Sequence, residues 1–260
     1  MVGLVLTAML WVSGCSQSPD RFGIAPNSEH RQRLELAQNL ASQNRNAEAA
    51  EVYRQSAEAA TSQKQRVEAL YQLGRHELGN DNLTGAEAAF REVVLLSPEN
   101  SSALIGIGMS RALNDDLKGA EPFLRDAVEL RDQAAFSPLG VTLDLQGRHV
   151  EAQAIYSQGL ELRPGDRELV ANLSLSYALG GDYDRAIGLA DPLARLIVPG
   201  RYKRNYVLIL ALAGRLAEAQ RTASSLEIDA KEVKQIFEVA TKLRNGSAAG
   251  RLSVLRELTV

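Results

Sequence analysis

The sequence has one cysteine in 260 residues, and only 5% of its side chains are aromatic. A single thiol excludes an intramolecular disulfide and a thiolate metal cluster. No excess of positive charge is present either, since 29 basic residues face 32 acidic ones for a net charge of -3. No global positive field therefore attracts nucleic acid. Scarce aromatics with abundant Ala and Leu favour closely packed helices, because strands prefer β-branched and aromatic residues.

The N-terminus lacks a hydrophobic run long enough to cross a bilayer. Leu4 to Val12 is apolar, which is about the length of a signal-peptide core and far short of the ~20 residues of a spanning helix. Residues 1–12 contain no Lys or Arg, although a signal peptide normally begins with positive charge. After Cys15 the chain is polar up to Glu29. A buried free cysteine on a short N-terminal helix is the alternative reading of this region.

Residues 12–15, Val-Ser-Gly-Cys, resemble the bacterial lipobox. The resemblance implies that residues 1–14 are a lipoprotein signal peptide, that Cys15 carries a lipid, and that residues 15–29 form a flexible linker. Ser16 stands behind Cys15 where an aspartate would imply retention in the inner membrane. The expected location is therefore the periplasmic face of the outer membrane, with the lipid at Cys15 as the membrane contact.

The rest of the chain is periodic. Six turn-like stretches are each followed by an alanine, and these alanines lie 32 to 37 residues apart: Ala49, Ala86, Ala120, Ala152, Ala186 and Ala219. A bulky residue follows four positions after each of the first four alanines. A Leu-Gly or Ile-Gly pair lies twelve residues before three of them, at Leu73-Gly74, Ile107-Gly108 and Leu139-Gly140. A fixed period of this length is the signature of a repeat architecture.

This pattern resembles the tetratricopeptide repeat (TPR). The resemblance implies an all-α, right-handed superhelical solenoid of about six helix-turn-helix repeats over residues 30–228. The expected repeat starts lie near residues 30, 67, 101, 133, 167 and 200. Residues 229–244 are predicted to form an Asp-capped amphipathic helix that covers the last repeat, with Val233, Ile236, Phe237 and Ala240 on one face. Residues 245–260 are the expected C-terminal tail.

No motif for catalysis or metal binding is found. His30, His76 and His149 fall in different repeats without a partner at ligand spacing, and the sequence contains no HExxH or G-x-S-x-G arrangement. We therefore expect no enzyme, no metal, no cofactor and no small-molecule substrate. The basic cluster at residues 201–204, with Tyr206 nearby, fits a solvated helix start better than a surface that stacks on bases, although it could meet an acidic partner.

In the TPR family the first helix of each repeat lines a concave face. Inward positions fall near the second, fifth, ninth and twelfth residues of each repeat, and they predict a groove that is apolar at its centre and charged toward its ends. No Lys or Asn occupies the fifth positions, so the clamp that some members use for a terminal carboxylate is absent. The expected ligand is an amphipathic helix or an extended apolar segment. The candidate groove residues are Tyr71, Arg75, Ile105, Met109, Val141, Asp144, Leu175, Arg204 and Leu208.

Residues 180–219, followed by a predicted helix after LEIDAKEV, resemble the TadD family of Flp pilus assembly lipoproteins. This finer resemblance implies an adaptor or pilotin-like factor that helps an outer-membrane secretin to assemble or localise. Other TPR lipoproteins fit the same pattern, such as a type IV pilus pilotin or an adaptor for outer-membrane assembly or murein enzymes. A soluble TPR interaction protein or a docking subunit of an enzyme would need no lipid.

Overall fold

The computed structural model describes residues 26–196 and 200–245. The predicted signal peptide, Cys15, residues 15–25 of the predicted linker and residues 246–260 of the tail lie outside these residues, whereas residues 26–29 of the predicted linker are part of the first helix. Within them, all regular secondary structure is helical, which confirms the all-α prediction. The helices are α1 (Pro26–Ser42), α2 (Asn46–Glu58), α3 (Gln63–Gly79), α4 (Leu83–Leu96), α5 (Ser101–Leu113), α6 (Leu117–Glu129), α7 (Phe136–Leu145), α8 (His149–Leu162), α9 (Arg167–Leu179), α10 (Tyr183–Ala194), α11 (Gly200–Leu212), α12 (Leu216–Ser225) and α13 (Ala230–Asn245).

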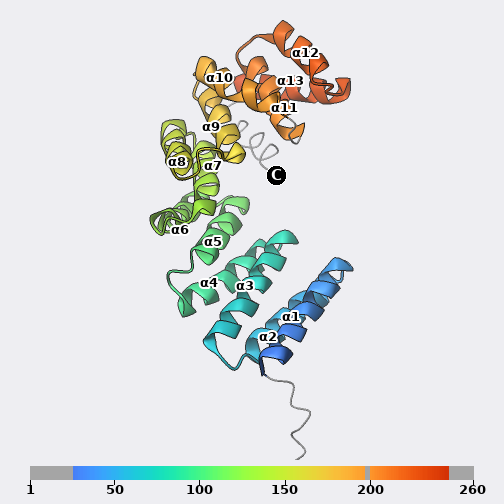
Figure 1. Ribbon diagram of the computed structural model, residues 1–260, viewed down its shortest axis with the longest axis vertical. Coiled ribbons are helices and arrows are strands. Elements are labelled where there is room, and N and C mark those ends of the chain that lie inside the picture. The colour runs from blue at the N-terminus through green and yellow to red at the C-terminus, as the bar shows by residue number, and fades with distance from the viewer. Residues whose placement is uncertain (1–25, 197–199, 246–260) are drawn as a thin grey trace, which may run out of the picture.

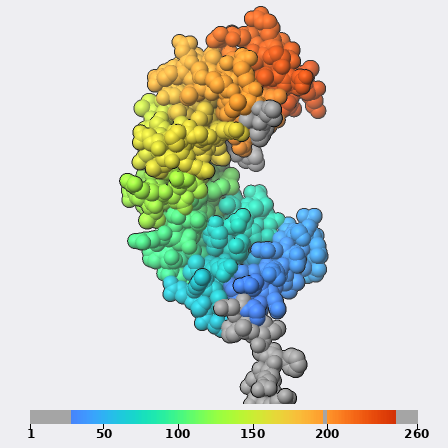
Figure 2. All heavy atoms as spheres, in the orientation of Figure 1, coloured from blue at the N-terminus to red at the C-terminus, as the bar shows by residue number. Residues whose placement is uncertain are grey.

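Six helix pairs, from α1–α2 to α11–α12, stack into an arc (Figure 1). Each helix from α2 to α11 packs on the helices before and after it, and odd-numbered helices of adjacent repeats also touch. The odd-numbered helices lie on the hollowed side of the arc, which we call the concave face, and the space-filling view shows this hollow between the first and last repeats (Figure 2). The even-numbered helices form the outer side.

Small residues let each pair pack closely around one large side chain. The Phe90 ring is 1% exposed. It lies between Gly74 of its own repeat and Gly106 of the next, where an added Cβ would lie 2.8 and 2.5 Å from ring atoms. The ring of Tyr156 covers Gly140 in the same way. The alternation of glycine and aromatic residues that gives the sequence its period is therefore what joins neighbouring repeats into one core.

The turn inside each of the six pairs has the same backbone form. The residue before the N-cap of the second helix has positive φ in every case: Asn44, Asp81, Asp115, Gly147, Gly181 and Gly214. Gly and Asn/Asp are the residue types that adopt this left-handed conformation at least cost. The recurring N-D, D-D and Gly turns of the sequence therefore fix the angle at which each pair closes.

The first two helix pairs begin one turn before the expected repeat starts. They open at Pro26 and Gln63, whereas the expected starts lie at residues 30 and 67. For α3 the cause is an N-cap, because the Ser62 hydroxyl accepts a hydrogen bond from the backbone N–H of Gln65 at 3.3 Å. A capped extra turn satisfies backbone donors that would otherwise lack partners.

The last helix, α13, departs from the stacking rule. It packs chiefly on α11 and makes little contact with α12. Val233, Ile236, Ala240 and Leu243 are buried in the last core cluster. Phe237 was expected on the same buried face, but its side chain is only partly buried. The helix is rotated so that Leu243 completes the buried stripe and Phe237 faces the space beside α12.

Candidate functional site

A row of apolar side chains lies partly exposed on the concave face. Met109 on α5, Val141 on α7 and Leu175 on α9 occupy the ninth position of three successive repeats. Each packs its inner part against a core cluster while its outer part reaches solvent. Because the same position recurs on helices that touch one another, these side chains form a row, which we call the apolar strip, across the middle of the arc.

Charged groups lie toward the two ends of this strip. On α3 the exposed Arg75 guanidinium stands 6.0 Å from the centroid of the Tyr71 ring, which is a cation–π contact. On α11 Arg204 is exposed and donates to Glu232 of α13 at 2.8 Å. The strip is therefore flanked by an aromatic–cation pair at one end and an ion pair at the other.

Three of the expected groove residues lie in the core. Ile105, Asp144 and Leu208 are 8%, 8% and 2% exposed. Ile105 belongs to the cluster between α5 and the following repeats, and Leu208 to the cluster that α11 shares with α13. Side chains this deeply buried cannot contact a ligand, so the structure corrects their assignment. The groove rests on the other six: Tyr71, Arg75, Met109, Val141, Leu175 and Arg204.

Asp144 instead organises a buried polar cluster between the fourth and fifth repeats. Its Oδ1 accepts from Ser176 Oγ at 2.7 Å and lies 2.8 Å from His149 Nδ1, while its Oδ2 accepts from Tyr156 OH at 3.1 Å. Burial raises the pKa of the Asp144 carboxyl, against the opposing effect of the hydrogen bonds from His149 and Ser176. The hydroxyl of Tyr156 lies in the core and requires a hydrogen-bond acceptor. Asp144, twelve positions earlier, is buried because it supplies that acceptor.

Three hydrogen-bonded polar residues on the concave face form a second cluster that was not predicted from the sequence. Ser137 on α7 donates to Glu168 of α9 at 2.8 Å and accepts from Asn172 Nδ2 at 2.9 Å. Ser137 and Glu168 stand at inward positions of their repeats, but Asn172 does not follow that spacing. These bonds tie adjacent odd-numbered helices together beside the apolar strip.

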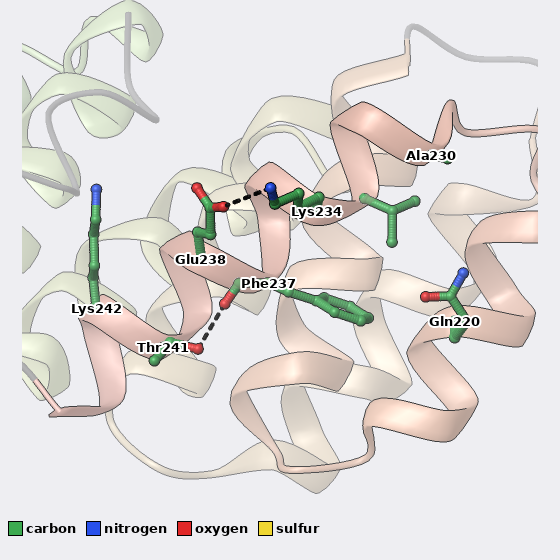
Figure 3. A pocket seen from close by; sticks show the side chains of 8 residues that line it. Gln220, Ala230, Lys234, Phe237, Glu238, Thr241 and Lys242 are labelled. Carbon is green, nitrogen blue, oxygen red and sulfur yellow. Dashed lines mark hydrogen bonds and ion pairs between the residues drawn. The ribbon is translucent and has the colours of Figure 1, made fainter.

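An open cavity lies between α12 and α13, at the end of the stack. Its volume is about 620 Å³, and Val233 and Phe237 supply its apolar lining. Figure 3 shows Phe237 pointing from α13 toward Gln220 on α12. Lys234 and Lys242 also line this cavity. The sequence predicted the helices that form α12 and α13, but it did not predict the cavity between them.

The histidines serve local contacts. His76 Nε2 lies 2.9 Å from the backbone oxygen of Asn46, and His30 Nδ1 lies 3.1 Å from Ser56 Oγ. No cluster of His, Cys, Asp and Glu in residues 26–196 and 200–245 has the form of a metal site.

The basic cluster that opens α11 has no free aromatic faces. Tyr202 and Tyr206 are 6% and 5% exposed. The Arg201 guanidinium lies 4.9 Å from the centroid of the Tyr202 ring. Buried rings cannot stack on bases, which agrees with the prediction of a solvated helix start.

Across the described part of the chain, no helix combines the length and hydropathy required to cross a membrane.

Stacked helix pairs with a concave face lined by the first helix of each pair define a helical-repeat solenoid. Residues 34–94 and 71–138 match the model of the tetratricopeptide repeat family. This part of the chain is therefore similar to tetratricopeptide repeats, and the all-helical fold as a whole is consistent with a TPR helical solenoid, as predicted. Such folds serve in general as non-enzymatic scaffolds that bind protein partners or peptides.

Solved structures share this fold at low sequence identity. A tetratricopeptide repeat protein from Parabacteroides merdae has a TM-score of 0.60 at 15% identity, covering 85% of this chain and 88% of its own. Pseudomonas aeruginosa pilF has a TM-score of 0.60 at 15% identity, covering 90% and 98%. YrrB, a TPR protein with an unusual peptide-binding site, has a TM-score of 0.51 at 16% identity, covering 65% and 91%. No curated protein sequence matches this chain.

Proposed function

We propose that this protein is a non-enzymatic scaffold that binds an apolar peptide segment along its concave face. The observation that carries the proposal is the strip formed by Met109, Val141 and Leu175, whose outer parts reach solvent on three adjacent helices. A monomer that serves only as a structural spacer has no need for an apolar strip on a recessed face. The peptide-binding site of YrrB, which has the same fold, is a property of that protein and supports this type of function.

The chemistry of the strip selects the ligand. An amphipathic helix or an extended segment would place apolar side chains against the strip, with a gain of about 25 cal/mol for each Å² of apolar surface buried. Arg75 and Arg204 lie toward opposite ends of the face, so acidic residues flanking the apolar stretch would set its position. The two ligand forms differ in spacing, since a helix contacts the strip every three or four residues and a strand every second residue.

The test of the binding face is the pair of single variants Met109→Asp and Leu175→Asp. Each places a charge in the strip, and we expect at least about a tenfold loss of partner binding because a charge would be buried without a partner. The matched control is Leu95→Asp, because this leucine is 81% exposed and belongs to α4, one of the outer helices. Full binding by both strip variants, with unchanged helical circular dichroism, would disprove the proposal.

The cellular setting that we propose is the outer membrane, with Cys15 lipidated and the solenoid facing the periplasm. The lipobox-like residues 12–15 and the polar stretch after them support this. Metabolic labelling with a palmitate analogue should mark the wild type and leave Cys15→Ser unmarked. An unlabelled wild type would favour the soluble TPR interaction protein instead.

Within that setting we propose a role in assembling or localising a pilus or secretion machine of the Flp type, with an outer-membrane secretin as the partner. The resemblance of residues 180–219 to TadD lipoproteins supports this choice. Co-expressed secretin should copurify with the wild type and with Leu95→Asp, but not with Met109→Asp. Binding of a different envelope protein with the same dependence on Met109 would point to another TPR lipoprotein, such as a type IV pilotin or a murein-enzyme adaptor.

A further inference from the structure

The two ends of the solenoid are unequal in how they are covered. At the start of the stack, Leu36 on α1 holds the seventh position of its repeat. The residues at that position in the five later repeats are buried in core clusters that span neighbouring repeats, and they are 6%, 0%, 0%, 6% and 5% exposed: Leu73, Ile107, Leu139, Leu173 and Tyr206. Leu36 is 50% exposed, because the described residues contain no helix before α1.

At the other end, the face that would receive a further repeat is open. In earlier repeats the residue after the periodic alanine reaches the next helix pair: Glu87 pairs with Arg111 at 2.8 Å, and Gln153 donates to the Ser176 backbone oxygen at 3.2 Å. Gln220 holds this position on α12 and has no such partner among the described residues, because α13 packs on α11 instead. The cavity beside Gln220 is what remains of the missing interface.

We propose that a second copy of this chain occupies that cavity, with its α1 helix placed against α12 and α13. Leu36 would then lie over the partly exposed Phe237, in the type of contact that its counterparts make inside the solenoid. The charges agree with this pairing, since Glu35 is exposed beside Leu36 and Lys242 is exposed at the rim of the cavity. Neither residue takes part in an ion pair within the described part of the chain.

The geometry also fixes the symmetry. The first end of one copy meets the last end of another, which is a heterologous interface, and such an interface leaves both outer ends free to add further copies. One exposed leucine and one cavity make a contact well below the size of a stable dimer. The association is therefore weak, and the fraction of associated copies grows with protein concentration.

Two differently tagged full-length copies, mixed in a mild detergent, crosslinked in solution and then purified through one tag, test this head-to-tail arrangement. The readout is the fraction of one copy that is captured with the other. Leu36→Glu on both copies should reduce capture at least about fivefold, and Phe237→Glu on both should do the same. Leu95→Glu on both is the matched control, because this exposed leucine lies away from either end, and capture should remain at the wild-type level.

The decisive sample combines Leu36→Glu on one copy with Phe237→Glu on the other. A head-to-tail contact keeps one intact pairing, so capture should return to at least half of the wild-type level, whereas either variant alone has none. A symmetric contact between two first ends would survive Phe237→Glu on both copies, and association through residues 1–25 would survive every variant. Either of these results, or absence of capture for the wild type up to about 500 µM, overturns the proposal.

Phe237 is partly buried, so Phe237→Glu could lower capture by disturbing the fold. A second variant at an exposed residue of the cavity separates the two effects. Ala230→Glu places an acid in the first turn of α13, where acids favour the helix, on an exposed residue that lines the cavity. It should reproduce the loss of capture with unchanged circular dichroism, since the new charge occupies the cavity and repels Glu35. Wild-type capture by Ala230→Glu would overturn the proposal whatever Phe237→Glu does.

Discussion

Asp144 shows how much a single buried acid holds in place. Its carboxylate accepts hydrogen bonds from the hydroxyls of Tyr156 and Ser176, and both residues are almost fully buried. Asp144→Ala leaves the Tyr156 hydroxyl without its hydrogen-bond partner, and it leaves Ser176 Oγ with only the long bond to the His149 backbone oxygen at 3.4 Å. We expect the free energy of unfolding to fall by about 2–4 kcal/mol. Chemical denaturation measures this. A loss below about 1 kcal/mol would mean that water replaces the carboxylate.

The pH dependence of Asp144 has a definite sign. Burial raises its pKa in the folded protein, so between the unfolded pKa of about 3.9 and the folded value the folded state holds more protons. The contribution of Asp144 to the free energy of unfolding is therefore fully present below that window and falls as the pH rises through it. The difference between wild type and Asp144→Asn, which does not titrate here, should decrease with pH in denaturation series. An increase would contradict the shift.

Replacing glycine by alanine should have opposite effects on stability at two helical positions. Gly106→Ala adds a Cβ 2.5 Å from the Phe90 ring, which is held between two repeats, so overpacking should cost about 1–3 kcal/mol in spite of the better helix propensity. The control is Gly188→Ala inside α10, where nothing lies within 4 Å, and it should stabilise by about 0.5–1 kcal/mol. Thermal unfolding of both variants measures the contrast. Equal effects would show that the ring moves freely.

At the residue scale, the period of the sequence was sufficient to place Met109, Val141 and Leu175 on the concave face. It was not sufficient for Leu208, which has the same register position. The period tells which way a side chain points, but not whether another helix covers it, and α13 covers α11. The prediction that Asp144 lines the groove is wrong for a different reason. Its partner Tyr156 lies on another helix, and only the packed structure brings their polar atoms together.

At the element scale, the second helices of the repeats begin in two ways. Asn82, Asp116 and Asp182 cap α4, α6 and α10 with a side-chain oxygen. Three other helices have an N-cap arginine whose side chain makes no cap but pairs with a glutamate three residues later: Arg45 before α2, Arg148 before α8 and Arg215 before α12. The glutamate of each pair lies in the first turn, where negative charge favours the helix.

This division predicts a stabilising change. Arg215 has φ -85° and ψ 53°, close to the backbone of the capping residue Asp116 at -88° and 64°. Arg215→Asn should therefore adopt the cap without strain, gaining about 1 kcal/mol from the cap and losing less from the exposed ion pair with Glu218. The melting temperature should rise. The control Arg215→Ala removes the ion pair without adding a cap, so it should not stabilise, and a fall with Arg215→Asn would refute the argument.

Helix boundaries were less predictable than helix existence. The alanine period and the turn residues indicate where each pair must close, because Gly and Asn/Asp meet the positive φ of each turn. The extra first turn of α3 depends on the cap at Ser62, which lies outside the repeat pattern. Local capping of this kind is superimposed on the repeat and is not visible in its period.

At the scale of the whole molecule, stability is a sum of neighbour contacts, since each repeat touches mainly the next one. The ends are therefore the weakest parts. Leu36 is uncovered at one end, and at the other α13 substitutes for a further repeat while leaving the cavity beside α12 open. The sequence predicted a covering helix, but its placement on α11 depends on which faces fit, and this is decided only when the helices pack.

The same neighbour rule predicts a local response to damage at the last helix. Ile236 of α13 is 8% exposed and lies in the cluster formed with α11. Ile236→Asp buries a charge there, so α13 should detach and expose the apolar residues of α11. Hydrogen exchange should lose protection over residues 200–245 by at least about tenfold, while α3 to α6 keep theirs, because no contact joins them directly to α13. Leu216→Asp, on a half-exposed leucine of α12, is the matched control and should leave exchange unchanged. A uniform loss along the chain would show instead that the solenoid unfolds as one cooperative unit.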